Sequence, residues 1–218
     1  AREIAGEISS IVVADLTSSG LFREIPRNRF IAQRKTFEEP VRFPDWRAVN
    51  AQALVTAAVN TSGSGQLTVK FRIFDIFSGV QLGKGTQLSG STGAARRMAH
   101  QVADQVYKRI TGEGAYFDSR IVFVSESGPK DKRLKRLAIM DSDGEKMKFL
   151  TGNDNIVLAP RISSDGKKVL YTSWETGFPQ IYLLDVETGR RKRVNTPGND
   201  VAFSPRFSPN NKRIVFSY

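Results

Sequence analysis

Residues 159–168, APRISSDGKK, align without gaps with residues 204–213, SPRFSPNNKR, 45 positions further along the chain. The alignment continues through the next five residues, VLYTS at 169–173 against IVFSY at 214–218. A fixed period of this length is typical of repeat proteins, and short β-branched or aromatic runs joined by Gly and Asn turns make each repeat a small antiparallel sheet. The sequence therefore predicts propeller blades of about 45 residues.

The repeat can be divided into strands. One complete blade is expected to hold four of them, with three strands of another blade before it and two strands of a third blade after it. The expected ranges are 120–125, 135–141 and 146–151, then 158–163, 168–174, 180–186 and 191–196, then 201–208 and 213–218. Propellers close with roughly 4 to 8 blades, so we expect the chain to be a fragment of a longer propeller.

The first half of the chain has a different pattern. Apolar residues at helical spacing predict helices over 3–19 and 92–110, and a shorter helix is expected at 44–50. Strands are expected at 21–25, 53–59, 66–77 and 80–88. In the third of these, apolar and polar residues alternate, which predicts a sheet with one buried and one wet face.

These patterns indicate an α+β fold class with two domains. Residues 1–113 are expected to form a small α/β sandwich, and residues 114–218 an incomplete all-β propeller of about two blades. Because blades depend on their neighbours for burial, we expect the first domain to unfold separately from them.

Composition excludes several classes of protein. The chain has no cysteine, so it has neither disulfides nor thiolate chemistry. Its net charge of +11 is spread over both halves, whereas nucleic-acid binders usually concentrate basic residues on one face. No apolar run approaches the ~18 residues of a membrane span.

The residues that could support catalysis are few. His100 is the only histidine and lies beside apolar positions of an expected helix, where packing or surface exposure is a simpler role than catalysis. Gly63-Ser64-Gly65 lacks the spacing of a hydrolase nucleophile elbow. Residues 141–144, DSDG, begin like a calcium loop but lack its later ligands, so we interpret them as a hairpin turn. We expect no enzyme activity, no metal and no cofactor.

Several runs together resemble one known family. They are SGLF at 19–22, DWRAVNAQALV at 45–55, FRIFDIFSG at 71–79, RLAIMD at 136–141 and SPRFSP at 204–209. In this order they are similar to the TolB family, the periplasmic component of the Tol-Pal envelope system of Gram-negative bacteria. The propeller motif alone is shared by many proteins, and the amino-terminal runs make the resemblance specific.

The resemblance implies a six-bladed propeller behind a small α/β domain. It also implies a periplasmic scaffold that links the lipoprotein Pal with inner-membrane Tol proteins, contacts the membrane only through these partners and binds no nucleic acid. The family begins with an extended segment that contacts TolA. Since this chain starts at what would be the first helix, we expect that arm to be missing.

Family members bind Pal on a propeller face, which directs attention to the loops of one face of the expected blades. Candidate partner-binding residues there are Asn153, Asp154, Asn155, Asn199, Asp200, Lys130, Lys132 and Arg133. For the Asn and Asp residues the alternative is that they are ordinary turn formers. For the basic cluster the alternative is a solvated loop. A second basic run, residues 190–193, falls on an outer strand, where charge discourages edge-to-edge aggregation.

Two other functions stay open from sequence alone. The first is the propeller portion of a serine peptidase of the prolyl oligopeptidase type, whose catalytic domain would lie outside this chain. The second is a basic nucleic-acid-binding module, which would show steeply salt-dependent binding.

Overall fold

The computed structural model describes residues 2–31, 35–152, 156–196 and 201–218. The chain forms two compact units, residues 1–118 and 119–218. Among the described helices, none has the length and apolar character needed to cross a bilayer. Helices and antiparallel sheets occur in the order expected, and the second unit is a partial propeller, so the α+β fold class is confirmed.

The sheet of the first unit is antiparallel and has β2 (Gln66–Asp75) at its centre. β1 (Ala53–Thr61) pairs along one edge of β2. β3 (Val80–Gln81) and β4 (Thr86–Ser91) pair in succession along its other edge. β1 is therefore an outer strand.

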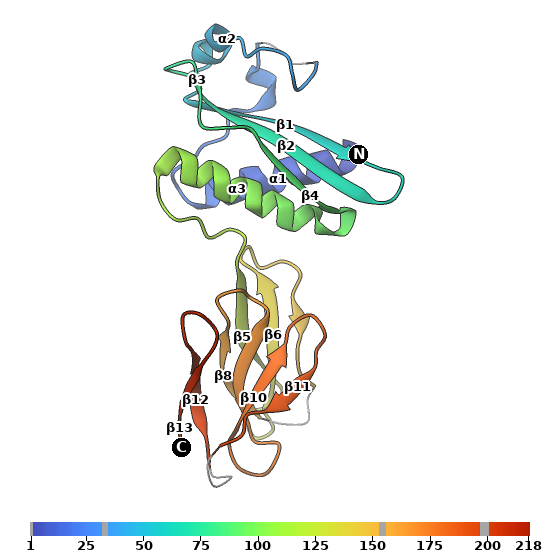
Figure 1. Ribbon diagram of the computed structural model, residues 1–218, viewed down its shortest axis with the longest axis vertical. Helices are drawn as coiled ribbons and strands as arrows, with labels where there is room; N and C mark the ends of the chain where they lie inside the picture. Colours follow the sequence, from blue (N-terminus) through green and yellow to red (C-terminus); the bar gives the residue numbers. More distant parts are fainter. Residues whose placement is uncertain (1, 32–34, 153–155, 197–200) are drawn as a thin grey trace. The chain divides into compact units, whose positions relative to one another are not determined.

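Two long helices, α1 (Arg2–Ser18) and α3 (Ala95–Thr111), cover one face of this sheet (Figure 1). Every second side chain of β2 points into the core that they form, and these four are completely buried: Leu67, Val69, Phe71 and Ile73. The alternation read from the sequence thus follows the pleat of the strand.

The opposite face of β2 is covered at one end only. Phe74 packs there with Trp46 of the short helix α2 (Phe43–Ala48). Arg47 of the same helix donates from Nε to the Ile76 carbonyl at 2.9 Å and from Nη2 to the Phe77 carbonyl at 3.1 Å. α2 is thereby tied to the turn that follows β2. The remaining short helices are η1 (Arg27–Arg29) and η2 (Thr92–Ala94).

The strand expected at residues 21–25 is wrong. This stretch is irregular, with Leu21 63% exposed and Phe22 packed against Tyr107, their ring centroids 6.1 Å apart. An apolar run becomes a strand only where a neighbour supplies a ladder, and in the described structure these residues pair with no strand.

The single strand expected at 80–88 is also wrong, because it is split into β3 and β4. The interruption occurs at Gly83, whose φ of +70° lies in the left-handed region. Arg109 of α3 donates to the carbonyls of Leu82 and Lys84, at 3.3 and 2.8 Å. These carbonyls are bound by a side chain rather than by a neighbouring strand.

The two compact units divide five residues later than the expected boundary at 113/114. Asp104 of α3 accepts hydrogen bonds from the backbone N–H groups of Phe117, at 2.7 Å, and Asp118, at 3.1 Å. Phe117 is buried against Tyr107. Burial raises the pKa of Asp104, an effect that the two backbone donors oppose. The connector is thus fastened to the first unit.

The second unit contains three antiparallel sheets. The first has the order β5-β6-β7, the second β11-β10-β9-β8, and the third pairs β12 with β13. Their bounds are β5 (Arg120–Ser127), β6 (Leu134–Asp141), β7 (Lys148–Phe149), β8 (Val157–Ile162), β9 (Lys168–Ser173), β10 (Gln180–Asp185), β11 (Arg191–Arg193), β12 (Phe203–Phe207) and β13 (Ile214–Ser217).

The two aligned stretches of sequence repeat each other in their hydrogen bonds. Ser163 Oγ donates to Asp165 Oδ1 at 2.6 Å and accepts from the Lys168 N–H at 2.9 Å. Ser208 Oγ bonds Asn210 Oδ1 at 2.8 Å and accepts from the Arg213 N–H at 2.9 Å. The same turn is therefore built once with an Asp and once with an Asn.

The inner strands also share an irregularity. Ala159 and Ser204, 45 residues apart in the alignment, both have positive φ, +50° and +54°. The β8–β9 and β12–β13 pairings each shift register next to these residues. A conserved bulge position within two copies of one repeat indicates that both are the same kind of inner blade strand.

Candidate partner-binding surface

The basic cluster predicted from the sequence lies in the hairpin between β5 and β6. Lys130, Lys132 and Arg133 are all exposed there. The turn has a defined shape, since the Lys132 N–H donates to the Pro129 carbonyl at 3.1 Å. Gly128 has a φ of +85°, and a Cβ at this position would lie 2.8 Å from the Lys132 carbonyl oxygen. The hairpin therefore depends on a glycine to present its three cations.

A fourth cation of this region is paired instead of presented. Lys135 Nζ lies 2.7 Å from Glu126 Oε1 across the base of the hairpin. This hydrogen bond, with the charges of Lys135 and Arg133, lowers the pKa of Glu126. The positive potential at the tip thus comes from Lys130, Lys132 and Arg133.

A second loop lies at the same end of the second unit. The arrows of β6 and β10 point the same way, so the hairpin before β6 and the loop before β10, residues 174–179, share one end (Figure 1). Phe178 of this loop is 43% exposed. The structure therefore brings together the two described parts of the face that the sequence indicated. The candidates Asn153, Asp154, Asn155, Asn199 and Asp200 lie outside the described residues.

The basic run at 190–193 lies on and beside β11, the outer strand of the second blade. The three residues of β11 are exposed, and one of them is also engaged. Arg191 Nη1 lies 2.7 Å from Glu175 Oε2, and its guanidinium lies 5.7 Å from the centre of the Tyr182 ring. Arg191 therefore links β11 to the loop at residues 174–179 in addition to placing charge on the edge.

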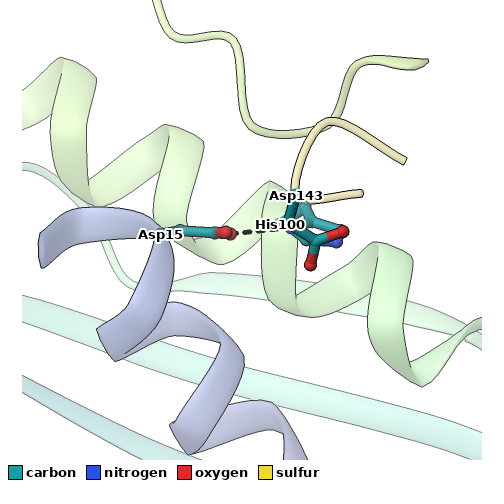
Figure 2. Close-up of side chains that lie close together, drawn as sticks. All are labelled: Asp15, His100 and Asp143. Atoms are coloured by element: carbon teal, nitrogen blue, oxygen red, sulfur yellow. Dashed lines mark hydrogen bonds and ion pairs between the residues drawn. The ribbon is translucent and has the colours of Figure 1, made fainter. Parts of the chain in front are cut away.

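His100 is packed in the first unit rather than exposed. Its side chain is nearly inaccessible, and Nδ1 lies 2.7 Å from Oδ2 of Asp15 on α1, which is also buried (Figure 2). The pair joins α1 to α3. Sequence reasoning missed Asp15. The available signal was its position, since it continues the helical spacing of Ile4, Ile8 and Ile11 on the apolar side of α1.

A hollow of about 350 Å³ lies at one end of the first unit's sheet, near the β1–β2 hairpin. Its lining offers hydroxyl and amide groups but no ionisable side chain, so it provides no general acid or base. The lining residues are Ser64, Gly65, Gln66, Ser89, Gly90 and Ser91.

Residues 141–144 form a hairpin turn, as the sequence indicated. The Gly144 N–H donates to the Asp141 carbonyl at 3.0 Å, and the Asp143 carboxylate accepts from the Glu145 N–H at 3.1 Å. Gly144 supplies the positive φ, +88°, that the turn requires.

Comparison with known families covers both units. Residues 1–82 match the TolB amino-terminal domain, and residues 107–218 match the TolB beta propeller domain. The chain belongs to the TolB family. The resemblance read from the sequence runs is thereby confirmed.

Two relatives named Tol-Pal system protein TolB illustrate the degree of similarity. The one from Roseobacter denitrificans is 54% identical over 203 residues, 93% of this chain and 46% of the relative. The one from Dinoroseobacter shibae is 55% identical over 204 residues, with the same two coverages. The crystal structure of TolB from Acinetobacter baumannii aligns with a TM-score of 0.78 at 28% identity, covering 96% of this chain and 51% of that protein. The chain thus spans about half the length of these relatives.

Proposed function

We propose that the chain is the amino-terminal half of a periplasmic scaffold of the Tol-Pal system. In this role it binds Pal and inner-membrane Tol proteins, and so supports outer-membrane integrity and envelope constriction at division. The observation that carries the proposal is the 54% identity, over 93% of the chain, to a relative named Tol-Pal system protein TolB. The candidate surface is the end of the second unit that carries the β5–β6 hairpin.

The chemistry of that hairpin favours an acidic partner. Three exposed cations, Lys130, Lys132 and Arg133, stand on a turn of defined shape, and the adjacent Glu126 is neutralised by Lys135. Charges at the rim of an interface act mainly on the rate of association and are screened by salt. Contacts with Pal at this surface are therefore proposed to be fast to form and sensitive to ionic strength.

A role without catalysis agrees with the side chains that are described. His100 is buried against Asp15, and the hollow beside the β1–β2 hairpin has no ionisable lining. No observation favours the peptidase alternative over the scaffold.

The test is binding to the purified soluble domain of Pal, followed by calorimetry and by stopped-flow association. The triple variant Lys130→Glu, Lys132→Glu and Arg133→Glu is expected to associate roughly 10-fold more slowly at low salt. The matched control reverses three exposed lysines of the turns at the other end of the blades, Lys146, Lys167 and Lys212.

The full-length relative from Roseobacter denitrificans is the positive control. If that relative binds Pal and this chain does not, the proposal that this half carries the binding surface is wrong. Equal slowing by the two triple variants would mean that net charge, rather than the β5–β6 hairpin, governs association.

A further inference from the structure

The outer edge of β1 exposes a regular row of backbone groups. The Ile76 N–H donates to the Gln52 carbonyl at 2.9 Å, and the Ser62 N–H donates to the Gln66 carbonyl at 2.9 Å. In an antiparallel ladder the residues bonded to one neighbour alternate with those that face away. Even-numbered residues of β1 therefore bond β2. The N–H and C=O groups of the odd-numbered residues, 53 to 61, point to the outer edge, which pairs with no strand in the described structure.

The side chains of β1 do nothing to block this edge. The strand reads ALVTAAVNT and contains neither a charged residue nor a proline in nine residues. β11, the outer strand of the second blade, consists of Arg191, Lys192 and Arg193. Charge and proline on outer strands are the common means by which proteins prevent pairing with another chain. The second blade has such charges on its outer strand, whereas the first unit has none on β1.

The sequence of β1 is nearly symmetrical about Ala57. In an antiparallel pair of two such strands centred on Ala57, Val55 lies opposite Val59 of the other copy, and Ala57 lies opposite itself. All opposed odd-numbered residues then form hydrogen-bonded pairs, because each directs its backbone groups outward. Val55 and Val59 already pack against the core beneath α1 and α3. Pairing would extend that core from one copy to the next.

We propose that β1 is a homotypic docking edge, at which a second copy of this chain adds its own β1 in antiparallel orientation. The two sheets then join into one, and the interface is isologous, with the same strand supplied by both partners. A second copy suits this edge because cross-strand β-branched pairs stabilise a sheet and no like charges meet in this register. This association is independent of the binding of Pal.

The test is sedimentation velocity of the chain over a wide concentration range. The wild type is expected to shift from monomer to dimer as concentration rises. Ala57→Lys places two ammonium groups opposite each other at the centre of the pair and is expected to keep the chain monomeric. Ala57→Val is the matched control, because it retains the neutral edge and favours a strand.

A control on the second unit separates this edge from others. Val215 of β13 is 67% exposed, and Val215→Lys is expected to leave dimerisation unchanged. The proposal is overturned if the wild type stays monomeric, or if Ala57→Lys dimerises as the wild type does. Loss of dimer in Val215→Lys with retention in Ala57→Lys would place the interface on β13 and would also overturn it. Circular dichroism of each variant establishes that it is folded.

A labelled peptide of residues 53–61 supplies a second measurement. It is expected to bind wild-type chain, and the same peptide N-methylated at residues 55, 57 and 59 is expected not to bind. N-methylation removes the outward donors without changing the side chains. Equal binding of the two peptides would show a side-chain contact instead of strand pairing and would contradict the proposal.

Discussion

β2 in the first unit and β9 with β10 in the second are all central strands, yet they are covered in different ways. β2 alternates buried residues with polar ones, and the two long helices cover the face that its buried residues form. β9 and β10 are apolar at successive positions and are covered on both faces. Leu170 and Ile181 pack toward the β12–β13 sheet, whereas Tyr171 and Leu184 pack toward the β5–β7 sheet.

The difference shows where each unit obtains its stability. The first unit buries its sheet with helices of its own. In the second unit each blade forms the core of its neighbour, as in repeat proteins generally. A substitution in the first unit should therefore act at one face of one strand, and a substitution in the middle blade should act on the contact with one neighbour or the other.

The largest effect is expected for Phe71→Ala in β2. Phe71 is completely buried, and truncation of a buried Phe costs about 3–5 kcal/mol of unfolding free energy. Its neighbour Lys70 points to the other face and is exposed, so Lys70→Ala should change stability by less than about 0.5 kcal/mol. Urea unfolding measures both, with Trp46 as reporter in a background where Trp174 is replaced by Phe. Similar losses for the two variants would contradict one-sided burial of β2.

A second pair of variants examines the middle blade. Leu170→Ala and Leu184→Ala truncate fully buried side chains on opposite faces, and each should cost about 2–5 kcal/mol. Trp174 fluorescence follows the second unit. Both losses should appear in its transition and leave the Trp46 transition of the first unit in place. A shift of both transitions by either variant would show that the two units unfold as one.

The smallest effect concerns the turn that occurs in two copies. Hydrogen bonds from Ser163 and the Lys167 N–H lower the pKa of Asp165, whereas Asn210 holds the matching position without titrating. A carboxyl with a lowered folded-state pKa contributes stability above its unfolded pKa of about 3.9 and loses it as pH falls through the folded value. Asp165→Asn should therefore weaken the loss of second-unit stability on acidification.

The measurement is the urea midpoint of the second unit from neutral pH to about pH 3, below the ordinary range of Asp. Part of the acid dependence should persist, because hydrogen bonds from Thr188 lower the pKa of Asp185 in the same way. An unchanged pH profile in Asp165→Asn would mean that the unfolded state holds Asp165 in a similar environment.

Much of the fold could be predicted from local patterns. The alternation in β2, the helical spacing in α1 and α3 and the 45-residue period each follow from the geometry of a single element or turn. The errors fell where a long-range partner decides the outcome. Residues 21–25 are apolar but have no strand beside them in the described structure, and Arg109 of α3 binds the carbonyls between β3 and β4.

The candidate surface divides in the same way. The exposed cations at 130, 132 and 133 were recognisable because a basic run between two strands must form a solvated hairpin. The neutralisation of Glu126 by Lys135 and the Arg191–Glu175 link were not, since both depend on which strands lie side by side.

The sequence by itself determined the repeat, the two kinds of strand and the lack of charge between residues 53 and 61, because these depend only on residue type and spacing. Only the tertiary structure decided that residues 53–61 are an outer strand and that Asp15 meets His100 from 85 positions away. The physical reason is that backbone geometry fixes the period of an element locally. Its neighbours are chosen by which buried faces and hydrogen-bonding groups remain to be satisfied when the whole unit packs.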